Sequence, residues 1–354
     1  MRPSVLIVRL SAIGDVVHGL PLARSVRRVR PDAQVTWIVQ REAAPLLERH
    51  PWVDRTILFP RRGGIRAILD FLIRLRAERF DLAIDLQGNT KSALVTAAAP
   101  ALYRLALRRS ALREGTAGFL PARRAPRPAG PHSVDRTLSL CRLMGDPDPR
   151  AEFGLDPQPD RSAVAAADLA GLPDPPVALS VGAGSDVREW PDGCWIEAAA
   201  ALRARGRGVV VLSGPRHAAR ARAIAEAAGV PHRAGTTDLP GLLAHLAVVR
   251  DRGGALVACD SAPLHLAVAL ALPCVALAGP QDPRRTGAYG HAHEALHVFS
   301  DLRCAPCLRR TCRRVDEPRA CMARITPALV LGRLDALLSA RRRVPGPEGL
   351  LHTT

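Results

Sequence analysis

Near its start the chain reads Val5-Leu6-Ile7-Val8-Arg9-Leu10-Ser11-Ala12-Ile13-Gly14-Asp15-Val16-Val17-His18. The apolar, partly β-branched run breaks between Ser11 and Gly14 and then resumes with helical spacing. This pattern predicts a buried first strand, a tight loop and a helix N-terminus. Open α/β sheets bind their ligands at the carboxyl ends of the strands, so the loop is a candidate site. Asp15 stands where a carboxylate either caps backbone N–H groups or faces a cleft as a proton acceptor.

The length and composition indicate a globular protein of two domains. The chain has 354 residues, which is too many for a single compact core. Its apolar fraction of 47% and mean hydropathy of +0.03 are those of a soluble protein. No apolar run reaches the roughly 20 residues that span a bilayer, and the N-terminus lacks the pattern of a signal peptide. We therefore expect a cytoplasmic protein.

The net charge of +17 fits three kinds of partner: nucleic acid, an anionic membrane surface or a phosphorylated substrate. Aromatic residues make up only 3% of the chain, which leaves few platforms for stacking bases. The sequence shows no motif of nucleic-acid recognition and no defined basic face, so we expect no nucleic-acid partner. Almost every basic residue is arginine, with Lys91 as the single lysine, and this bias reduces what the charge says about function.

Apolar runs that suit strands alternate with segments of helical periodicity, first up to about residue 99 and again after residue 176. Such alternation predicts doubly wound parallel sheets. Residues 100–130 show no clear periodicity, and residues 145–176 are rich in Pro and Asp. The predicted fold class is therefore α/β, with two Rossmann-like domains whose parallel sheets face each other across a cleft. The expected bounds are 1–160 and 170–335, followed by a helix end and loose tail at 336–354.

Loops of the second half suit a diphosphate. Gly182-Ala183-Gly184-Ser185 follows a predicted strand and lets backbone N–H groups approach an anion. Arg188 can add a bidentate contact, and Ser261 precedes a predicted helix whose dipole favours negative charge. A nicotinamide-dependent oxidoreductase is a rival interpretation. It would need Gly-x-Gly-x-x-Gly with an acid about 20 residues later, and the third glycine is absent here.

Six motifs together resemble glycosyltransferase family 9, the bacterial lipopolysaccharide heptosyltransferases, over about residues 4–335. The first, Ser-x-Ile-Gly-Asp-Val-x-His, is most similar to the form in the heptosyltransferase I group. The motifs are Ser11 to His18, Asp85 to Ser92, His132 to Arg136, Gly182 to Pro191, Asp260 to His265, and Gly279 to Pro283 with Thr286.

The resemblance implies a GT-B fold and an inverting, metal-independent transfer. The implied donor is ADP-L-glycero-D-manno-heptose, and the implied acceptor is the Kdo-lipid A region of the lipopolysaccharide inner core. No cofactor is expected. The implied location is cytoplasmic, peripheral at the anionic inner face of the cytoplasmic membrane. Heptosyltransferase II or III, or another sugar transferase of the family, remains an alternative.

The resemblance also implies roles for individual residues, with Asp15 as the catalytic base. Two departures from the family pattern are Ala262, where glycine is usual, and Glu189, where a basic residue is common. Lys91 has the alternative of a solvated helix-start lysine, and His265 that of a core histidine. The acceptor-binding residues implied are Ser11, Gly14, Lys91, His132 and Arg136. The donor-binding residues implied are Gly182, Ala183, Gly184, Ser185, Arg188, Asp260, Ser261, Ala262 and His265.

Four of the eight cysteines are spaced like metal ligands, at Cys304, Cys307, Cys312 and Cys321. The resemblance gives this segment no catalytic role. Bound zinc and free thiols both remain open, and no metal is expected in catalysis.

Overall fold

The computed structural model describes residues 2–235, 238–291, 295–299 and 301–343. The chain divides into two compact units, Met1–Asp156 and Pro157–Thr354, and each is described here by itself. Of the predicted tail, residues 344–354 lie outside the described part.

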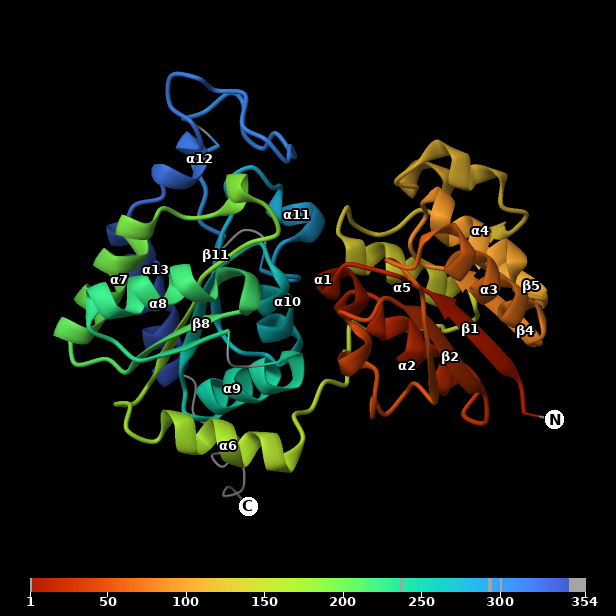
Figure 1. Ribbon diagram of the computed structural model, residues 1–354, viewed down its shortest axis with the longest axis horizontal. Helices are drawn as coiled ribbons and strands as arrows, with labels where there is room; N and C mark the ends of the chain where they lie inside the picture. Colours follow the sequence, from red (N-terminus) through yellow and green to blue (C-terminus); the bar gives the residue numbers. More distant parts are fainter. Residues whose placement is uncertain (1, 236–237, 292–294, 300, 344–354) are drawn as a thin grey trace, which may run out of the picture. The chain divides into compact units, whose positions relative to one another are not determined.

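The first unit is built on a six-stranded parallel sheet in the order β3-β2-β1-β4-β5-β6 (Figure 1). The central strand β1 (Ser4–Val8) pairs with β2 (Gln34–Val39) and β4 (Phe80–Asp85). Because β1 and β4 are neighbours, the loops that follow them leave the sheet side by side. The outer strands are β3 (Arg55–Leu58), β5 (Ala101–Ala106) and β6 (Arg123–Arg124).

Alternate side chains of β1 fill two layers. Leu6 and Val8 join a core with residues of α3 (Gly64–Arg76) and α4 (Thr90–Ala98). Helices α2 (Leu20–Val29) and α5 (Ser133–Leu143) pack against each other, and their C-terminal ends adjoin Val5 and Leu82 on the other face. The described elements of this unit also include α1 (Ile13–Val17) and the 3-10 helices Ala44–Leu46, Arg109–Ala111 and Gly115–Phe119.

The second unit contains a five-stranded parallel sheet in the order β11-β10-β7-β8-β9. Its main core lies between this sheet and α7, α8 and α13, while α9 packs against α6 and α10 (Figure 1). In the part of the chain that the structure describes, no helix is both long and apolar enough to cross a bilayer. The strands are β7 (Val177–Ser180), β8 (Val209–Ser213), β9 (His232–Ala234), β10 (Ala255–Cys259) and β11 (Cys274–Leu277). The helices are α6 (Pro159–Leu169), α7 (Asp192–Ala204), α8 (Ala218–Ala228), α9 (Leu239–Asp251), α10 (Ala262–Ala269), α11 (Pro283–Thr286), α12 (Ala320–Ala323) and α13 (Pro327–Arg343), with 3-10 turns at Asp186–Arg188 and Pro215–His217.

The α/β class with two parallel sheets is confirmed, and the local differences have physical causes. After β1 the chain forms two helices, α1 and α2, with His18 and Gly19 between them. A Cβ atom at Gly19 would lie 2.7 Å from Leu86 Cδ2 and 3.1 Å from the Trp37 ring, so a side chain there would require these buried side chains to shift. Strand β5 was not predicted, because Arg104 interrupts its apolar residues and a stretch rich in Arg, Pro and Gly follows it.

Two tryptophans of the second core offer a matched test of packing. Trp190 and Trp195 are both fully buried and pack edge to face at 4.9 Å. Trp190 Nε1 donates to the Ile325 carbonyl at 2.7 Å, whereas Trp195 Nε1 has no partner among the described residues. Replacing Trp190 leaves the Ile325 carbonyl without its hydrogen-bond donor, whereas replacing Trp195 removes a donor that has no acceptor.

We therefore predict that Trp190→Phe lowers the free energy of unfolding by about 1–3 kcal/mol more than Trp195→Phe. Chemical denaturation of both variants beside the wild type measures the difference. Equal losses would show that the Ile325 hydrogen bond contributes nothing.

Candidate active site

Asp15 lies in the first turn of α1, directly beyond the carboxyl end of β1. Its Oδ2 atom accepts a hydrogen bond from the Ala12 backbone N–H at 3.2 Å. The capping interpretation is therefore part of the structure. Capping is one of several contacts of this side chain, because each carboxylate oxygen also forms an ion pair with an arginine.

Two arginines hold the Asp15 carboxylate from different directions. Arg9 Nη2 lies 2.6 Å from Oδ1, and Arg113 Nη2 lies 2.7 Å from Oδ2. The Arg9 side chain is 5% exposed and also donates to the Leu86 carbonyl, so it is fixed in the interior. The Arg113 side chain is 45% exposed and comes from the loop after β5, where its backbone N–H donates to the Gly88 carbonyl at 2.8 Å.

These neighbours set the protonation of Asp15. Burial acts to raise the pKa of its carboxyl, but the nearby charges of Arg9, Arg113 and His18 outweigh burial and hold that pKa well below its usual range. Burial in turn lowers the pKa of the Arg9 guanidinium. At neutral pH Asp15 is therefore an ionised carboxylate, but a weak base as long as both ion pairs persist.

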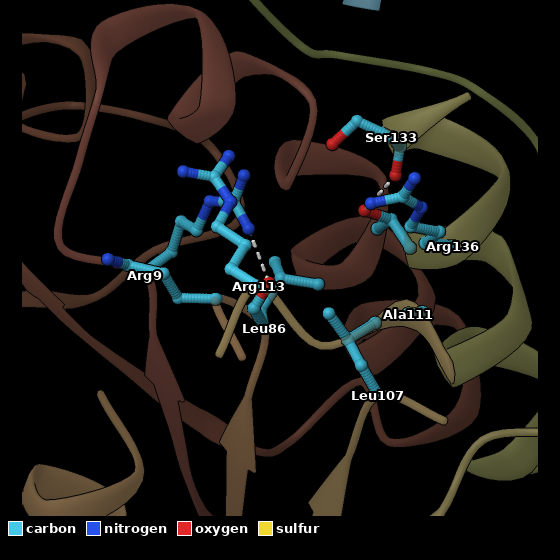
Figure 2. Close-up of a pocket in the computed structure, with 9 residues that line it drawn as sticks. Arg9, Leu86, Leu107, Ala111, Arg113, Ser133 and Arg136 are labelled. Atoms are coloured by element: carbon cyan, nitrogen blue, oxygen red, sulfur yellow. Dashed lines mark hydrogen bonds between the residues drawn. The ribbon is translucent and has the colours of Figure 1, made fainter. Parts of the chain in front are cut away.

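A small cavity opens beside this carboxylate on the first unit. Figure 2 shows Arg9 and Arg113 on one side of it and Arg136 with Ser133 on the other. Three guanidinium groups thus line one space, and none of the described residues that line it is a carboxylate. Such a concentration of donors suits an anionic group. The remaining lining residues are Leu86, Gln87, Leu107, Ala111 and Thr137.

The other residues predicted for acceptor binding are placed differently. Ser11 and Gly14 lie in the turn that carries Asp15. His132 is buried at the start of α5, where its Nδ1 accepts from Val134 N–H at 3.1 Å and its ring packs against His18. Lys91 does not line the cavity, and its ammonium lies over the Phe59 ring at 5.7 Å. The structure thus brings Arg136, but not Lys91, to the space beside Asp15.

On the second unit, loops after β7, β10 and β11 meet around Asp260. Its Oδ1 lies 3.3 Å from His265 Nε2, and its Oδ2 lies 3.8 Å from Arg188 Nη1 and accepts from Thr286 Oγ1 at 3.3 Å. With its amide oxygen turned toward Arg188, Gln281 accepts from that guanidinium at 3.2 Å. His265 is therefore buried and also paired with Asp260.

The glycine-rich loop after β7 needs Gly182. This residue has φ +111°, and a Cβ atom there would lie 2.4 Å from His217 Cδ2. The neighbouring Ala183 N–H donates to Glu189 Oε1 at 3.3 Å, so that N–H supports the loop. Glu189 is itself paired with Arg220, which neutralises the charge expected to oppose an anion.

Ser185 and Ser261 place hydroxyl groups near these loops. Ser185 Oγ is buried and has no hydrogen-bond partner among the described residues. Ser261 Oγ donates to the Cys259 carbonyl at 3.1 Å and does not cap α10. Gly184 is exposed beside Ser185, and Ala262 forms the first residue of α10.

Sequence reasoning missed Arg9 and Arg113 as site residues. Arg9 directly follows the first strand inside its apolar run, and Arg113 lies 98 positions from Asp15 in a segment without periodicity. Gln281 and Thr286 did carry a signal, because both belong to a quoted motif after β11.

The four spaced cysteines lie in the segment before α13. Burial, followed by the neighbouring Cys307, Cys312 and Cys304, raises the pKa of the Cys321 thiol to about 11. Cys312 Sγ accepts from the Arg319 backbone N–H at 3.3 Å. Within the described ranges, no three or more Cys, His, Asp or Glu side chains are arranged to hold a metal ion. The choice between bound zinc and free thiols stays open.

Comparison with known proteins shows the family to which the chain belongs. A model of glycosyltransferase family 9 (heptosyltransferase) matches residues 68–316. The lipopolysaccharide heptosyltransferase 1 of Pseudomonas aeruginosa is 34% identical over 95% of this chain and 98% of its own length. The chain belongs to glycosyltransferase family 9. It is a glycosyl-transferring enzyme that is most like heptosyltransferase I: the Escherichia coli heptosyltransferase 1 is 28% identical over 81% of this chain, and the Escherichia coli heptosyltransferase 3 is 25% identical over 76%.

Solved structures agree with the fold of this family 9 enzyme. Escherichia coli heptosyltransferase WaaC with ADP has a TM-score of 0.71 at 25% identity and covers 94% of this chain and 99% of its own. Escherichia coli ADP-heptose lipopolysaccharide heptosyltransferase II has a TM-score of 0.73 at 24% identity and covers 97% and 100%. The predicted GT-B fold class is confirmed.

The glycine-rich loop of the enzyme gives a second matched prediction. Gly182→Ala forces an L residue into a positive-φ conformation and against His217, whereas a Cβ atom at Gly184 would meet open space among the described residues. We expect Gly182→Ala to lower the free energy of unfolding by about 1–3 kcal/mol and Gly184→Ala to leave it nearly unchanged. Denaturation curves of the two variants check this, and equal stability would mean that the loop accommodates a side chain at residue 182.

Proposed function

We propose that this enzyme transfers heptose from ADP-L-glycero-D-manno-heptose to a Kdo hydroxyl of the lipopolysaccharide inner core, with inversion and without a metal ion. The observation that carries the proposal is the ionised Asp15 carboxylate beside an arginine-lined cavity at the carboxyl end of β1. Likeness to the heptosyltransferase 1 proteins supports the sugar and the acceptor region. The ADP in the solved WaaC structure supports the nucleotide.

The second unit would hold the donor diphosphate. Arg188 supplies a guanidinium, the unpartnered Ser185 Oγ supplies a hydroxyl, and Ser261 lies at the start of α10. The leaving group is ADP, whose negative charge grows as the glycosidic bond breaks. Fixed donors and a helix N-terminus stabilise such a charge without reorganising. These groups do the work that a metal ion performs in other transferases.

The transfer is a single displacement. The acceptor hydroxyl oxygen forms a bond to the anomeric carbon of heptose while the bond from that carbon to the β-phosphate oxygen of ADP breaks. The electron pair of the broken bond leaves with ADP, and the hydroxyl proton passes to the Asp15 carboxylate. One displacement inverts the anomeric carbon and requires one base, which is the role that Asp15 fills.

The acceptor side suits a charged, membrane-anchored molecule. The three arginines of the cavity favour an acceptor that carries anionic groups, as Kdo does with its carboxylate. The net charge of +17 also suits the anionic inner face of the cytoplasmic membrane. We therefore propose that the enzyme works there as a peripheral protein.

Asp15→Asn tests the base directly. Asparagine caps a helix about as well as aspartate, so the turn keeps its hydrogen bond, but the amide cannot accept the proton. We expect turnover to fall roughly 10²–10⁴-fold while ADP affinity, measured by calorimetry, stays the same. Radiolabelled heptose transfer to Kdo2-lipid A measures the rate. Near-normal turnover would mean that Asp15 only caps the helix and pairs with arginine.

A further inference from the structure

We propose that the outward face of helix α3 is a docking surface for an anionic lipid bilayer. Its apolar side chains enter the lipid boundary, and the arginines beside them meet the headgroups. The inference rests on the proposed function in one respect, the membrane-anchored acceptor, and it names the surface by which the enzyme meets that membrane.

Helix α3 carries apolar side chains on two different faces. Phe71 and Leu75 are buried in the core against the sheet. Ile65, Leu69 and Ile73 follow one another in steps of four and form one line along the helix, called here the outer stripe. Their exposed fractions are 79%, 53% and 65%. A surface helix normally turns polar residues away from the core, so the outer stripe is an apolar surface that the described part of the chain leaves uncovered.

The neighbouring helix α4 adds to this feature. Helices α3 and α4 contact each other and cover the same face of the sheet (Figure 1). Leu94 on α4 is 63% exposed. Single apolar residues scattered over a surface are ordinary, but several that gather on one face mark an interaction site. This side of the first unit therefore presents an apolar surface that calls for a partner.

The segment around the outer stripe is strongly basic. Between residues 61 and 79 the chain has six arginines, namely Arg61, Arg62, Arg66, Arg74, Arg76 and Arg79. The same segment has two acidic residues, Asp70, which is exposed, and Glu78, which accepts from Arg55 at 3.2 Å. Glu42 lies 4.0 Å from Arg61. Positive charge therefore remains in excess, and it favours an anionic partner.

An anionic bilayer matches both the apolar stripe and the charge. A helix with an apolar face and arginines beside it lies in the plane of the membrane interface, with that face about 5–10 Å into the boundary between headgroups and acyl chains. With 13 residues, α3 is about 20 Å long and can lie along this interface. A second copy of the chain matches less well, because a two-fold contact would place the same arginines opposite each other.

Vesicle binding by the full chain tests the docking surface. The double variant Ile65→Gln with Leu69→Gln removes two members of the outer stripe, and glutamine keeps both the helix propensity and the net charge. The matched control, Leu102→Gln with Val164→Gln, removes two aliphatic side chains that are 74% and 59% exposed on β5 and α6. In co-sedimentation with vesicles of equal parts phosphatidylglycerol and phosphatidylcholine, the outer-stripe variant should bind at least roughly tenfold more weakly than the wild type. The control should bind as the wild type does.

A second pair of variants tests the charge. Arg66→Gln should weaken binding to the anionic vesicles about fivefold, the contribution of one arginine near such a surface. Arg222→Gln, which replaces an exposed arginine of α8, should change binding little. The wild type should bind vesicles of phosphatidylcholine alone far more weakly, and added salt should lower its affinity for the anionic vesicles.

The proposal is overturned if the outer-stripe variant and its control bind the anionic vesicles equally, or if the wild type does not bind them. It is also overturned if sedimentation velocity shows a wild-type dimer that the outer-stripe variant loses, because a second copy would then cover the stripe.

Heptose transfer separates docking from catalysis. With a soluble Kdo saccharide the outer-stripe variant should keep the turnover of the wild type, and with Kdo2-lipid A in anionic vesicles it should show a raised acceptor KM. Lost turnover with the soluble saccharide would place the stripe in the acceptor site and contradict docking. If the wild type transfers heptose to neither acceptor, the proposed function fails, and the vesicle-binding result still decides the docking surface.

Discussion

The Asp15 carboxylate between two guanidinium groups is the interaction on which the chemistry of the first unit depends. Arg9 reaches it from the end of the central strand, and Arg113 reaches it from the loop that follows β5. Parallel pairing of β1 with β4 and of β4 with β5 brings these segments to one sheet edge. The fold therefore supplies the electrostatics, since no local sequence places two cations on this aspartate.

The second unit also has a parallel sheet, but a different arrangement of charged side chains gathers at the ends of its strands. Its loops leave neighbouring parallel strands and meet around Asp260, which Arg188, His265 and Thr286 share. Glu189, the carboxylate that follows Arg188 in the sequence, pairs with Arg220. The buried Ser185 hydroxyl has no hydrogen-bond partner among the described residues. The first unit thus presents a carboxylate paired with two arginines, and the second a group of polar side chains around Asp260.

Much of the fold was predictable because buried parallel strands are continuous apolar runs and the turns after them carry Gly, Asp and Ser. Asp15 and Arg188 were predicted as site residues from such turns, Asp260 was implied by the family resemblance, and their roles stay predictions. Strand β5 was missed because Arg104 interrupts its short apolar run. Arg113 was missed because the contact with Asp15 spans 98 positions, and one arginine among many carries no signal for such a pairing.

The central claim is a single displacement at the anomeric carbon, with Asp15 as its base. NMR spectroscopy of the heptosylated Kdo product, made from ADP-L-glycero-D-manno-heptose of known anomeric form, tests it most directly. The one-bond carbon–hydrogen coupling of the new linkage should report the configuration opposite to that of the donor. A product that retains the donor configuration would require a second nucleophile and would contradict a one-base mechanism.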